Sequence, residues 1–204
     1  MLSHRLLLKS GYISQLSAGI FSFTPMGWRV ISNIKKIIDD EMKKINCFES
    51  NLPVIQPSDI WKQSGRIDSF IPPLANFQDR RDKKMIIAPT HEEAVIDLVK
   101  NYLRSFRDLP FSLYHIQTKF RDETRPRGGL LRVREFEMKD AYSFHADEKS
   151  LDETFEKFSE AYFNIFKKCG LNVVKVAADS GAIGGKVSSE FVSLSDSGED
   201  TILM

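Results

Sequence analysis

The sequence is poor in several residue types that mark specialised proteins. It contains only 2 cysteines among 204 residues, Cys47 and Cys169, whose spacing forms neither a disulfide framework nor a metal-ligand pattern. We interpret both as small buried hydrophobic residues in a reducing compartment. It also lacks an excess of either charge, with 29 basic and 28 acidic residues. A chain this neutral is not a general binder of nucleic acid, so any contact with RNA or phosphate has to come from a local cluster.

Long hydrophobic runs and internal repeats are missing as well. The most apolar stretch near the start, Leu6-Leu7-Leu8 between Arg5 and Lys9, is too short for a signal peptide or a membrane span. We therefore expect a cytoplasmic protein without a membrane segment. What is present is ordinary for a globular chain: 42% apolar, 28% charged and 11% aromatic residues, including 15 phenylalanines. The length predicts one domain, or one domain with a small appendage, and is sufficient for a hydrophobic core.

Hydrophobic periodicity predicts an α+β fold built around an antiparallel sheet. Apolar residues at three- and four-residue steps predict a helix over 28–46, and a Thr-x-x-Glu pattern opens another at about 90–104. A Ser-x-x-Glu capping box at Ser150 predicts a third helix that ends at Gly170. Strands are predicted over 48–57 at a sheet edge or an interface, and over 85–89, 111–123, 131–138, 171–177 and 191–194. Residues 61–83 are expected to be a loop, and the mixed charges of 79–84 a solvated turn.

The two strands around Gly128-Gly129 form a predicted hairpin that gathers residues suited to a nucleotide. Arg121 and Glu123 share one face of the first strand, and Arg132 and Phe136 share one face of the second. Guanidinium groups bind phosphate oxygens, a carboxylate accepts from an exocyclic amine, and an aromatic ring stacks on a purine. The alternative is a surface hairpin whose charges are solvated and whose Phe136 lies in the core.

The loop of this hairpin carries two further positive charges, Arg125 and Arg127. They lie beside the glycines, where a phosphate backbone can approach closely. Taken alone, these two arginines are more typical of a solvated loop.

Thr90-His-Glu-Glu93 allows two interpretations. Its spacing fits a helix capping box, in which Thr90 caps the helix and Glu93 hydrogen-bonds back to the cap. That leaves Glu92 unexplained, and a carboxylate at a helix start is suited to binding an ammonium group. The two interpretations are compatible.

Other motifs do not lead to a site. Ser180–Ser188 resembles a phosphate-binding loop but begins with serine and has Val187 after the lysine, so we predict a turn. The four histidines show no metal-ligand spacing, and we assign no metal site. His115 and His145 are interpreted as structural. No carboxylate pair or nucleophile triad stands out.

Several segments together resemble one family. Residues 120–129, 132–136 and 138–144 look like motif 2 of class II aminoacyl-tRNA synthetases, specifically of bacterial-type prolyl-tRNA synthetase. Residues 88–93 resemble the proline-binding loop of that family, and the helix before Leu52-Pro53-Val54 resembles motif 1. Residues 180–191 and 196–200 look like the approach to the inserted domain of the family. The resemblance covers essentially the whole chain.

The resemblance implies a reaction and a set of roles. The family uses ATP with Mg²⁺ to convert proline to prolyl-adenylate, and then transfers the prolyl group to tRNA(Pro). By position, Arg121 would hold the α-phosphate and the proline carboxylate and act as the catalytic group. The remaining implied roles are adenine binding by Glu123 and Phe136, outer-phosphate binding by Arg132, proline ammonium binding by Thr90 and Glu92, contact with the tRNA acceptor stem by Arg125 and Arg127, and a homodimer interface at Pro53 in motif 1.

The sequence also departs from the family pattern. It contains no Gly-x-Gly-x-x-Arg pattern, so motif 3 is absent and the expected class II sheet is incomplete. We expect residues 1–204 to be the N-terminal part of a catalytic core, with 178–204 leading into an inserted editing domain. Two hypotheses remain: a portion of a prolyl-tRNA synthetase, or a stand-alone non-catalytic relative that binds a nucleotide, tRNA or a partner subunit. A second chain that carries motif 3 would separate them.

Overall fold

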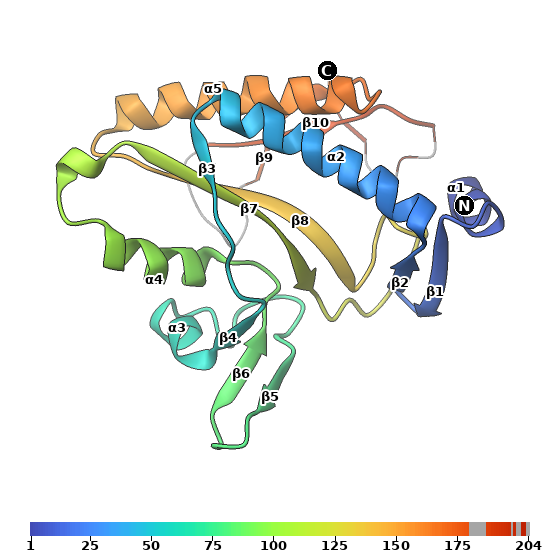
Figure 1. The fold of residues 1–204 in the computed structure, drawn as a ribbon, viewed down its shortest axis with the longest axis horizontal. Coiled ribbons are helices and arrows are strands. Elements are labelled where there is room, and N and C mark those ends of the chain that lie inside the picture. Colours follow the sequence, from blue (N-terminus) through green and yellow to red (C-terminus); the bar gives the residue numbers. More distant parts are fainter. Residues whose placement is uncertain (180–186, 197, 199–200, 203–204) are drawn as a thin grey trace.

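A three-stranded sheet forms the centre of the molecule. The computed structural model describes residues 1–179, 187–196, 198 and 201–202. The sheet has the order β3 (Cys47–Glu49), β7 (Phe111–Phe120), β8 (Glu135–Phe144). The long strands β7 and β8 are antiparallel, with Phe111 opposite Phe144 and Phe120 opposite Glu135, whereas the short β3 runs parallel to β7. Figure 1 shows this pair of long strands crossing the middle of the fold.

Helices cover both faces of this sheet (Figure 1). The helices α2 (Pro25–Lys44) and α5 (Glu148–Lys168) lie on one face, over a core of Met42, Cys47, Tyr114, Ala161 and Ile165. The helix α4 (Glu92–Tyr102) lies on the other face, over a core of Leu52, Ala94, Val95, Val99 and Leu113. Successive β7 residues point to opposite faces, as the predicted alternation requires.

The starts of two helices differ from the sequence prediction. The helix predicted over 28–46 is α2, and it begins at Pro25. Thr24 caps it, because its hydroxyl oxygen accepts from the Gly27 backbone N–H at 3.3 Å, and proline follows at the first helical position. The predicted capping box at Ser150 is wrong. The cap is Asp147, whose carboxylate accepts from the Ser150 backbone N–H at 2.8 Å. Gly170, with φ of +78°, follows the last residues of α5 as predicted.

The first 23 residues form structure that the periodicity did not predict. They contain the helix α1 (Leu2–Lys9) and a hairpin of β1 (Ile13–Ser17) and β2 (Ile20–Phe23). The hairpin is tied to the β7–β8 loop, since the Gly19 carbonyl accepts from the Arg134 backbone N–H at 2.8 Å.

A second small sheet lies at the end of the molecule below α4 in Figure 1. It has the order β4 (Ile55–Pro57), β6 (Lys84–Ile87), β5 (Asn76–Gln78), and the helix α3 (Ser58–Gln63) packs against it. A 3₁₀ turn of Phe106–Asp108 follows α4 in the chain. The predicted loop over 61–83 was therefore wrong in part, because it contains β5 and the end of α3. The predicted strand over 48–57 is two strands in different sheets, separated by irregular backbone around Pro53. The turn at 79–84 is confirmed, with the Asp79 carboxylate accepting from the Arg81 and Lys83 backbone N–H groups.

The last described strands are β9 (Val174–Ala178) and β10 (Ser188–Val192), an antiparallel pair close to the predicted ranges. Phe191 packs against Tyr162, Phe163 and Phe166 of α5. Most of the turn predicted at Ser180–Ser188, and part of the segment 196–200, lie outside the described residues. Within the described part of the chain, every helix is too short or too polar to cross a membrane.

Candidate active site

The long connection between β7 and β8 carries most of the predicted site. The prediction of a second strand from Leu131 was wrong: β8 begins at Glu135, and residues 121–134 are a loop. The loop closes on itself through a bridge between Arg127 and Arg132, whose backbones exchange hydrogen bonds of 3.0 and 3.1 Å. Gly128 and Gly129, with φ near +69°, make the turn that this bridge encloses. Arg132 therefore reaches the site from a loop rather than from a strand.

Four of the predicted residues line one cavity of about 530 Å³: Arg121, Glu123, Arg132 and Phe136. The Arg121 guanidinium carbon lies 5.5 Å from the centre of the Phe136 ring, and Arg132 Nε donates to Glu123 Oε2 at 2.8 Å. The alternative of a solvated hairpin with Phe136 in the core is not what the structure shows. A cavity with two guanidinium groups, one carboxylate and one aromatic face can accept a nucleotide.

Glu123 is held as a carboxylate acceptor within this cavity. Its Oε1 accepts from the Arg125 backbone N–H at 3.1 Å, and its Oε2 accepts from Arg132. The hydrogen bond from Arg125 and then that from Arg132 lower the pKa of Glu123 below its usual value. Glu123 is therefore ionised at neutral pH and can accept from an amino group.

The start of α4 differs from the predicted capping box. His91 occupies the N-cap position without a side-chain cap hydrogen bond, so Thr90 lies one residue too early to cap the helix. Thr90 Oγ1 instead donates to Glu92 Oε1 at 2.8 Å. The Glu93 carboxylate does not reach back to Thr90, because Ser64 and Arg66 donate to its Oε1 at 2.9 and 3.0 Å. The capping-box prediction was therefore wrong, and the structure pairs Thr90 with Glu92 instead.

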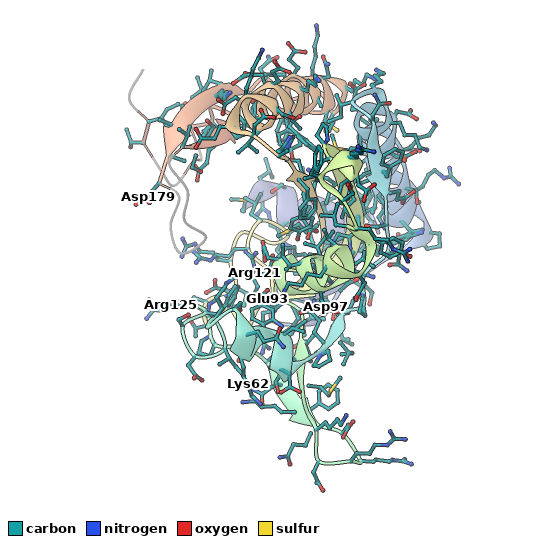
Figure 2. The ribbon with its side chains drawn as sticks, turned by 90° about the vertical axis from the view of Figure 1, so that its left-hand side faces the viewer. Lys62, Glu93, Asp97, Arg121, Arg125 and Asp179 are labelled. Atoms are coloured by element: carbon teal, nitrogen blue, oxygen red, sulfur yellow. The ribbon has the colours of Figure 1, made fainter. Side chains whose placement is uncertain are left out.

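Glu92 lies between the loop that precedes α4, which carries Pro89 and Thr90, and a second cavity. Its Oε2 accepts from Arg66 Nη1 at 3.3 Å, and it lines a cavity of about 300 Å³ together with Arg66. Arg121 Nε donates to the Pro89 carbonyl at 3.2 Å, which holds the guanidinium against the loop that carries Thr90 and Glu92. Burial lowers the pKa of Arg121, and the nearby charge of Glu92 opposes this change. Figure 2 labels Arg121 near the middle of the molecule.

A buried cluster of polar residues lies on the same face of the sheet, and sequence reasoning did not find it. Lys119, His91 and His115 have exposed fractions of 0%, 0% and 1%. Lys119 Nζ lies 2.5 Å from His91 Nδ1, 3.0 Å from His115 Nε2 and 2.8 Å from Asp140 Oδ1. Tyr142 also donates to Asp140. The sequence spacing of the histidines indicated no metal site. In the fold, the atoms of His91, His115 and Asp140 that could ligate a metal lie within 4.8 Å of one another. The cation among them is the ammonium group of Lys119.

The protonation of this cluster follows from burial and charge. Burial, and then the positive charge of Lys119, lower the pKa of His91 to about 4. Neutral His91 can therefore accept from Lys119 at Nδ1 and donate from Nε2 to the Pro53 carbonyl, which lies 3.1 Å away. Burial alone would raise the pKa of Asp140. Hydrogen bonds with His115, Lys119 and Tyr142 outweigh it and keep that pKa well below its usual range.

The other predicted residues lie on the surface. Arg125 and Arg127 are exposed on the β7–β8 loop, and Figure 2 shows Arg125 at the outer side of the molecule. The Pro53 ring is also exposed, while its carbonyl contacts His91. None of these three residues shares a cavity with Arg121 among the described pockets.

Comparison with known proteins identifies similar sequences. Residues 76–200 match the family described as the tRNA synthetase class II core domain (G, H, P, S and T). The chain is 54% identical over 202 residues to a proline–tRNA ligase of Dehalococcoides mccartyi, and 50% identical over 202 residues to one of Pediococcus pentosaceus. Each alignment covers 99% of this chain but only 36% and 35% of the relative, so the chain spans about a third of their length.

Solved structures show the same fold. A Giardia lamblia prolyl-tRNA synthetase in complex with prolyl-adenylate superposes with a TM-score of 0.78, at 21% identity, over 85% of this chain and 36% of that one. A Cryptosporidium parvum prolyl-tRNA synthetase with halofuginone and AMPPNP superposes with a TM-score of 0.81, at 20% identity, over 92% of this chain and 39% of that one. At these identities the likeness concerns the arrangement of helices and strands.

Proposed function

Because the chain belongs to the family of tRNA synthetase class II core domains, we propose that it forms the part of a prolyl-tRNA synthetase that binds ATP and proline. The relatives at 50–54% identity are named proline–tRNA ligases, which supports proline as the amino acid. These names also favour the hypothesis that the chain is a portion of an enzyme over the hypothesis of a stand-alone, non-catalytic protein that binds a nucleotide or tRNA. The proposed reaction is the activation of proline by ATP, as its Mg²⁺ complex, to prolyl-adenylate and the transfer of the prolyl group to tRNA(Pro).

The observation that carries this proposal is the position of Arg121. Its side chain lines the 530 Å³ cavity, and its Nε is bound to the loop that presents Thr90 and Glu92. One guanidinium thus lies between groups suited to a nucleotide and groups suited to an amine. A reaction that joins an amino acid carboxylate to the α-phosphate of ATP needs a cation at that junction.

The proposed mechanism assigns each group by its chemistry. Arg121 holds the α-phosphate and the proline carboxylate in line, and stabilises the negative charge that builds at phosphorus. Glu123 accepts from the adenine amino group, Phe136 stacks on the ring, and Arg132 binds the outer phosphates. Thr90 and Glu92 bind the proline ammonium group. For Glu92 to do so, the substrate has to share a carboxylate that already accepts from Arg66 and Thr90.

The surface residues support two further proposals about partners. Arg125 and Arg127 are exposed on a loop that begins at the nucleotide cavity, and this position suits contact with the phosphates of a tRNA acceptor stem. We also propose a homodimer through motif 1. The exposed Pro53 ring and Phe48, which is 66% exposed, offer an apolar surface beside the end of β3.

Two proposals concern the setting of the chain. Both cysteines are free thiols, which is consistent with a reducing compartment such as the cytoplasm. Residues 1–204 would form the N-terminal part of the catalytic core, and 178–204 would lead into an inserted editing domain. The share of 36% of the relative's length is consistent with such a division.

Calorimetric binding of proline and of a non-hydrolysable ATP analogue to the purified chain tests the proposed function. We expect binding of both, with proline binding strengthened by the nucleotide because the two share Arg121. Hydroxyproline and alanine serve as matched amino acids that should bind more weakly. Failure of the chain to bind proline in the presence of the analogue would overturn the proposal. Proline-dependent exchange of pyrophosphate into ATP then measures whether the chain alone supports chemistry.

A further inference from the structure

The buried Lys119 carries no role in the proposed reaction, yet its burial is costly. An ammonium group with 0% exposure is stable only when it is paired and hydrogen-bonded. An apolar side chain would fill the same space beneath α4 without that cost. The presence of a charged side chain here is therefore explained by the groups that Lys119 connects.

Lys119 joins three separate segments of the chain. His91 lies in the loop before α4, His115 lies on β7, and Asp140 lies on β8, and each places a polar atom within 3.0 Å of the ammonium nitrogen. His115 Nε2 also lies 2.9 Å from Asp140 Oδ2. The single proton that this nitrogen can carry decides whether it donates to Asp140 or accepts from Lys119. In either case the ammonium lies at the centre of the cluster.

The link from Lys119 to His91 is one of three successive connections between the end of β7 and the loop. Lys119 donates to the His91 ring, the Phe120 backbone N–H donates to the Ala88 carbonyl at 3.0 Å, and Arg121 donates to the Pro89 carbonyl. His91 lies directly between Thr90 and Glu92 in the chain, and its other ring nitrogen is fixed by Pro53. Its ring is therefore held at both ends.

A second path runs from the ammonium to Thr90. Lys119 pairs with Asp140, Asp140 accepts from the Tyr142 hydroxyl, and Tyr142 interacts with the Thr90 side chain. The first path thus ends at His91, between Thr90 and Glu92 in the chain, and the second ends at Thr90, whose hydroxyl donates to Glu92.

We propose that Lys119 is a positioning residue of the amino acid site, where its buried ammonium sets the spacing between the Thr90–Glu92 loop and Arg121. This inference rests on the proposed function, since it concerns the proline end of that site. The proline ammonium and carboxylate are a fixed distance apart, so a shift of the loop relative to Arg121 weakens proline binding while the nucleotide cavity stays intact.

The test compares Lys119→Met with Lys139→Met in the full chain. Methionine keeps an unbranched side chain that reaches to Cε and removes the ammonium group. Lys139 is a matched control on the paired strand, where it donates to Tyr162 on the opposite face. We expect Lys119→Met to lower the affinity for proline by at least about tenfold, and to leave the affinity for the ATP analogue within about twofold. Lys139→Met should leave both affinities unchanged.

Two further measurements separate positioning from a general loss of stability. A nitrogen-15 NMR titration of the histidine rings should show His91 neutral down to about pH 4 in the wild type, and protonated at higher pH in Lys119→Met. If Lys119→Met does not fold, His91→Gln tests the same link, because it keeps the pair of Lys119 and Asp140. In Lys119→Ala, added propylammonium should restore proline binding by occupying the space of the lost side chain, whereas uncharged propanol should not.

The outcomes are distinguishable. Proline and nucleotide affinities that fall together, or proline affinity that is unchanged in the folded variants, would overturn the positioning role while leaving the proposed function in place. A wild-type chain that binds no proline would instead overturn the proposed function, and the positioning role with it.

Discussion

Arg132 Nε donates to Glu123 Oε2 at 2.8 Å across the mouth of the β7–β8 loop. The pair joins the two ends of a loop that connects the long strands, and both residues line the 530 Å³ cavity. Each is also assigned to a part of ATP, the outer phosphates for Arg132 and adenine for Glu123. Bound ATP would therefore compete with an ion pair that already exists, and its net affinity depends on how that pair rearranges.

Replacement of Arg132 by glutamine should weaken nucleotide binding selectively. We expect the affinity for the ATP analogue to fall about tenfold and its salt dependence to decrease, since one phosphate contact is lost. Proline binding without nucleotide should stay unchanged, because Arg132 lies away from the Thr90–Glu92 loop. Calorimetry at two salt concentrations measures both effects. Arg29→Gln, exposed on α2, is the control, and equal losses in the two variants would contradict the assignment.

Arg121 should matter more for chemistry than for nucleotide binding. The assay needs a preparation in which a second chain that carries motif 3 restores activity. In it, Arg121→Ala should lower proline-dependent pyrophosphate exchange by roughly 10²–10³-fold, the usual effect of removing one donor to a developing negative charge. Arg121→Lys keeps the charge but loses the planar fork that spans Pro89 and the cavity, so only a small part of the activity should return. Exchange that survives in Arg121→Ala would remove this residue from the proposed mechanism.

Much of the fold followed from local patterns. Alternation in 111–123 predicted β7 and its two faces, and periodicity predicted α2, α4 and α5, because each of these elements buries one stripe of its own residues. In the small sheet, the predicted strands over 48–57 and 85–89 correspond in part to β4 and β6, but β5 was missed because it has only three residues. A run that short carries too few alternating positions to be recognised.

The part of the site that was predicted also followed from local sequence patterns. Arg121, Glu123 and Phe136 were found because they lie within or next to one hairpin, and their neighbourhood follows from strand pairing. The capping boxes at Thr90 and Ser150 failed since several polar residues compete for each helix start, and spacing alone does not choose among them.

The Lys119 cluster lay beyond spacing arguments, because its members come from three segments. One signal was available. His115 and Lys119 share the face of Arg121, and the register of the hairpin places Asp140 opposite His115. A prediction of that register from the sequence would have required the true start of β8, which the alternation over 131–138 obscured.

The buried His91 should make the fold sensitive to mild acid. Its pKa is about 4 in the folded protein and near 6.5 in an unfolded chain, so between these values the unfolded state binds more protons. Its contribution to stability is therefore complete above pH 6.5 and is lost as the pH falls toward 4, by about 3 kcal/mol in total. Urea unfolding at pH 7.0 and pH 4.5 measures the change. His91→Gln should be less stable at pH 7 but should lose less on acidification, and an equal loss would contradict this origin.

Gly27 should be needed for the attachment of the N-terminal hairpin to α2. Alanine usually stabilises a helix relative to glycine by about 1 kcal/mol, so local propensity favours Gly27→Ala. A Cβ at this position would lie 2.1 Å from the Tyr12 carbonyl oxygen, which is backbone and also accepts from the Thr24 backbone N–H at 3.1 Å. We therefore expect Gly27→Ala to destabilise the protein by about 1–3 kcal/mol in urea unfolding.

The matched control for this change is Ser32→Ala, at an exposed position of the same helix, which should be neutral or slightly stabilising. Hydrogen exchange adds a local measurement. The amides of β1 and β2 should exchange faster in Gly27→Ala, because the hairpin has to move away from α2 to relieve the overlap with Tyr12, while the amides of β7 keep their protection. Stabilisation by Gly27→Ala would mean that the close approach of the Tyr12 carbonyl to α2 is not retained in solution.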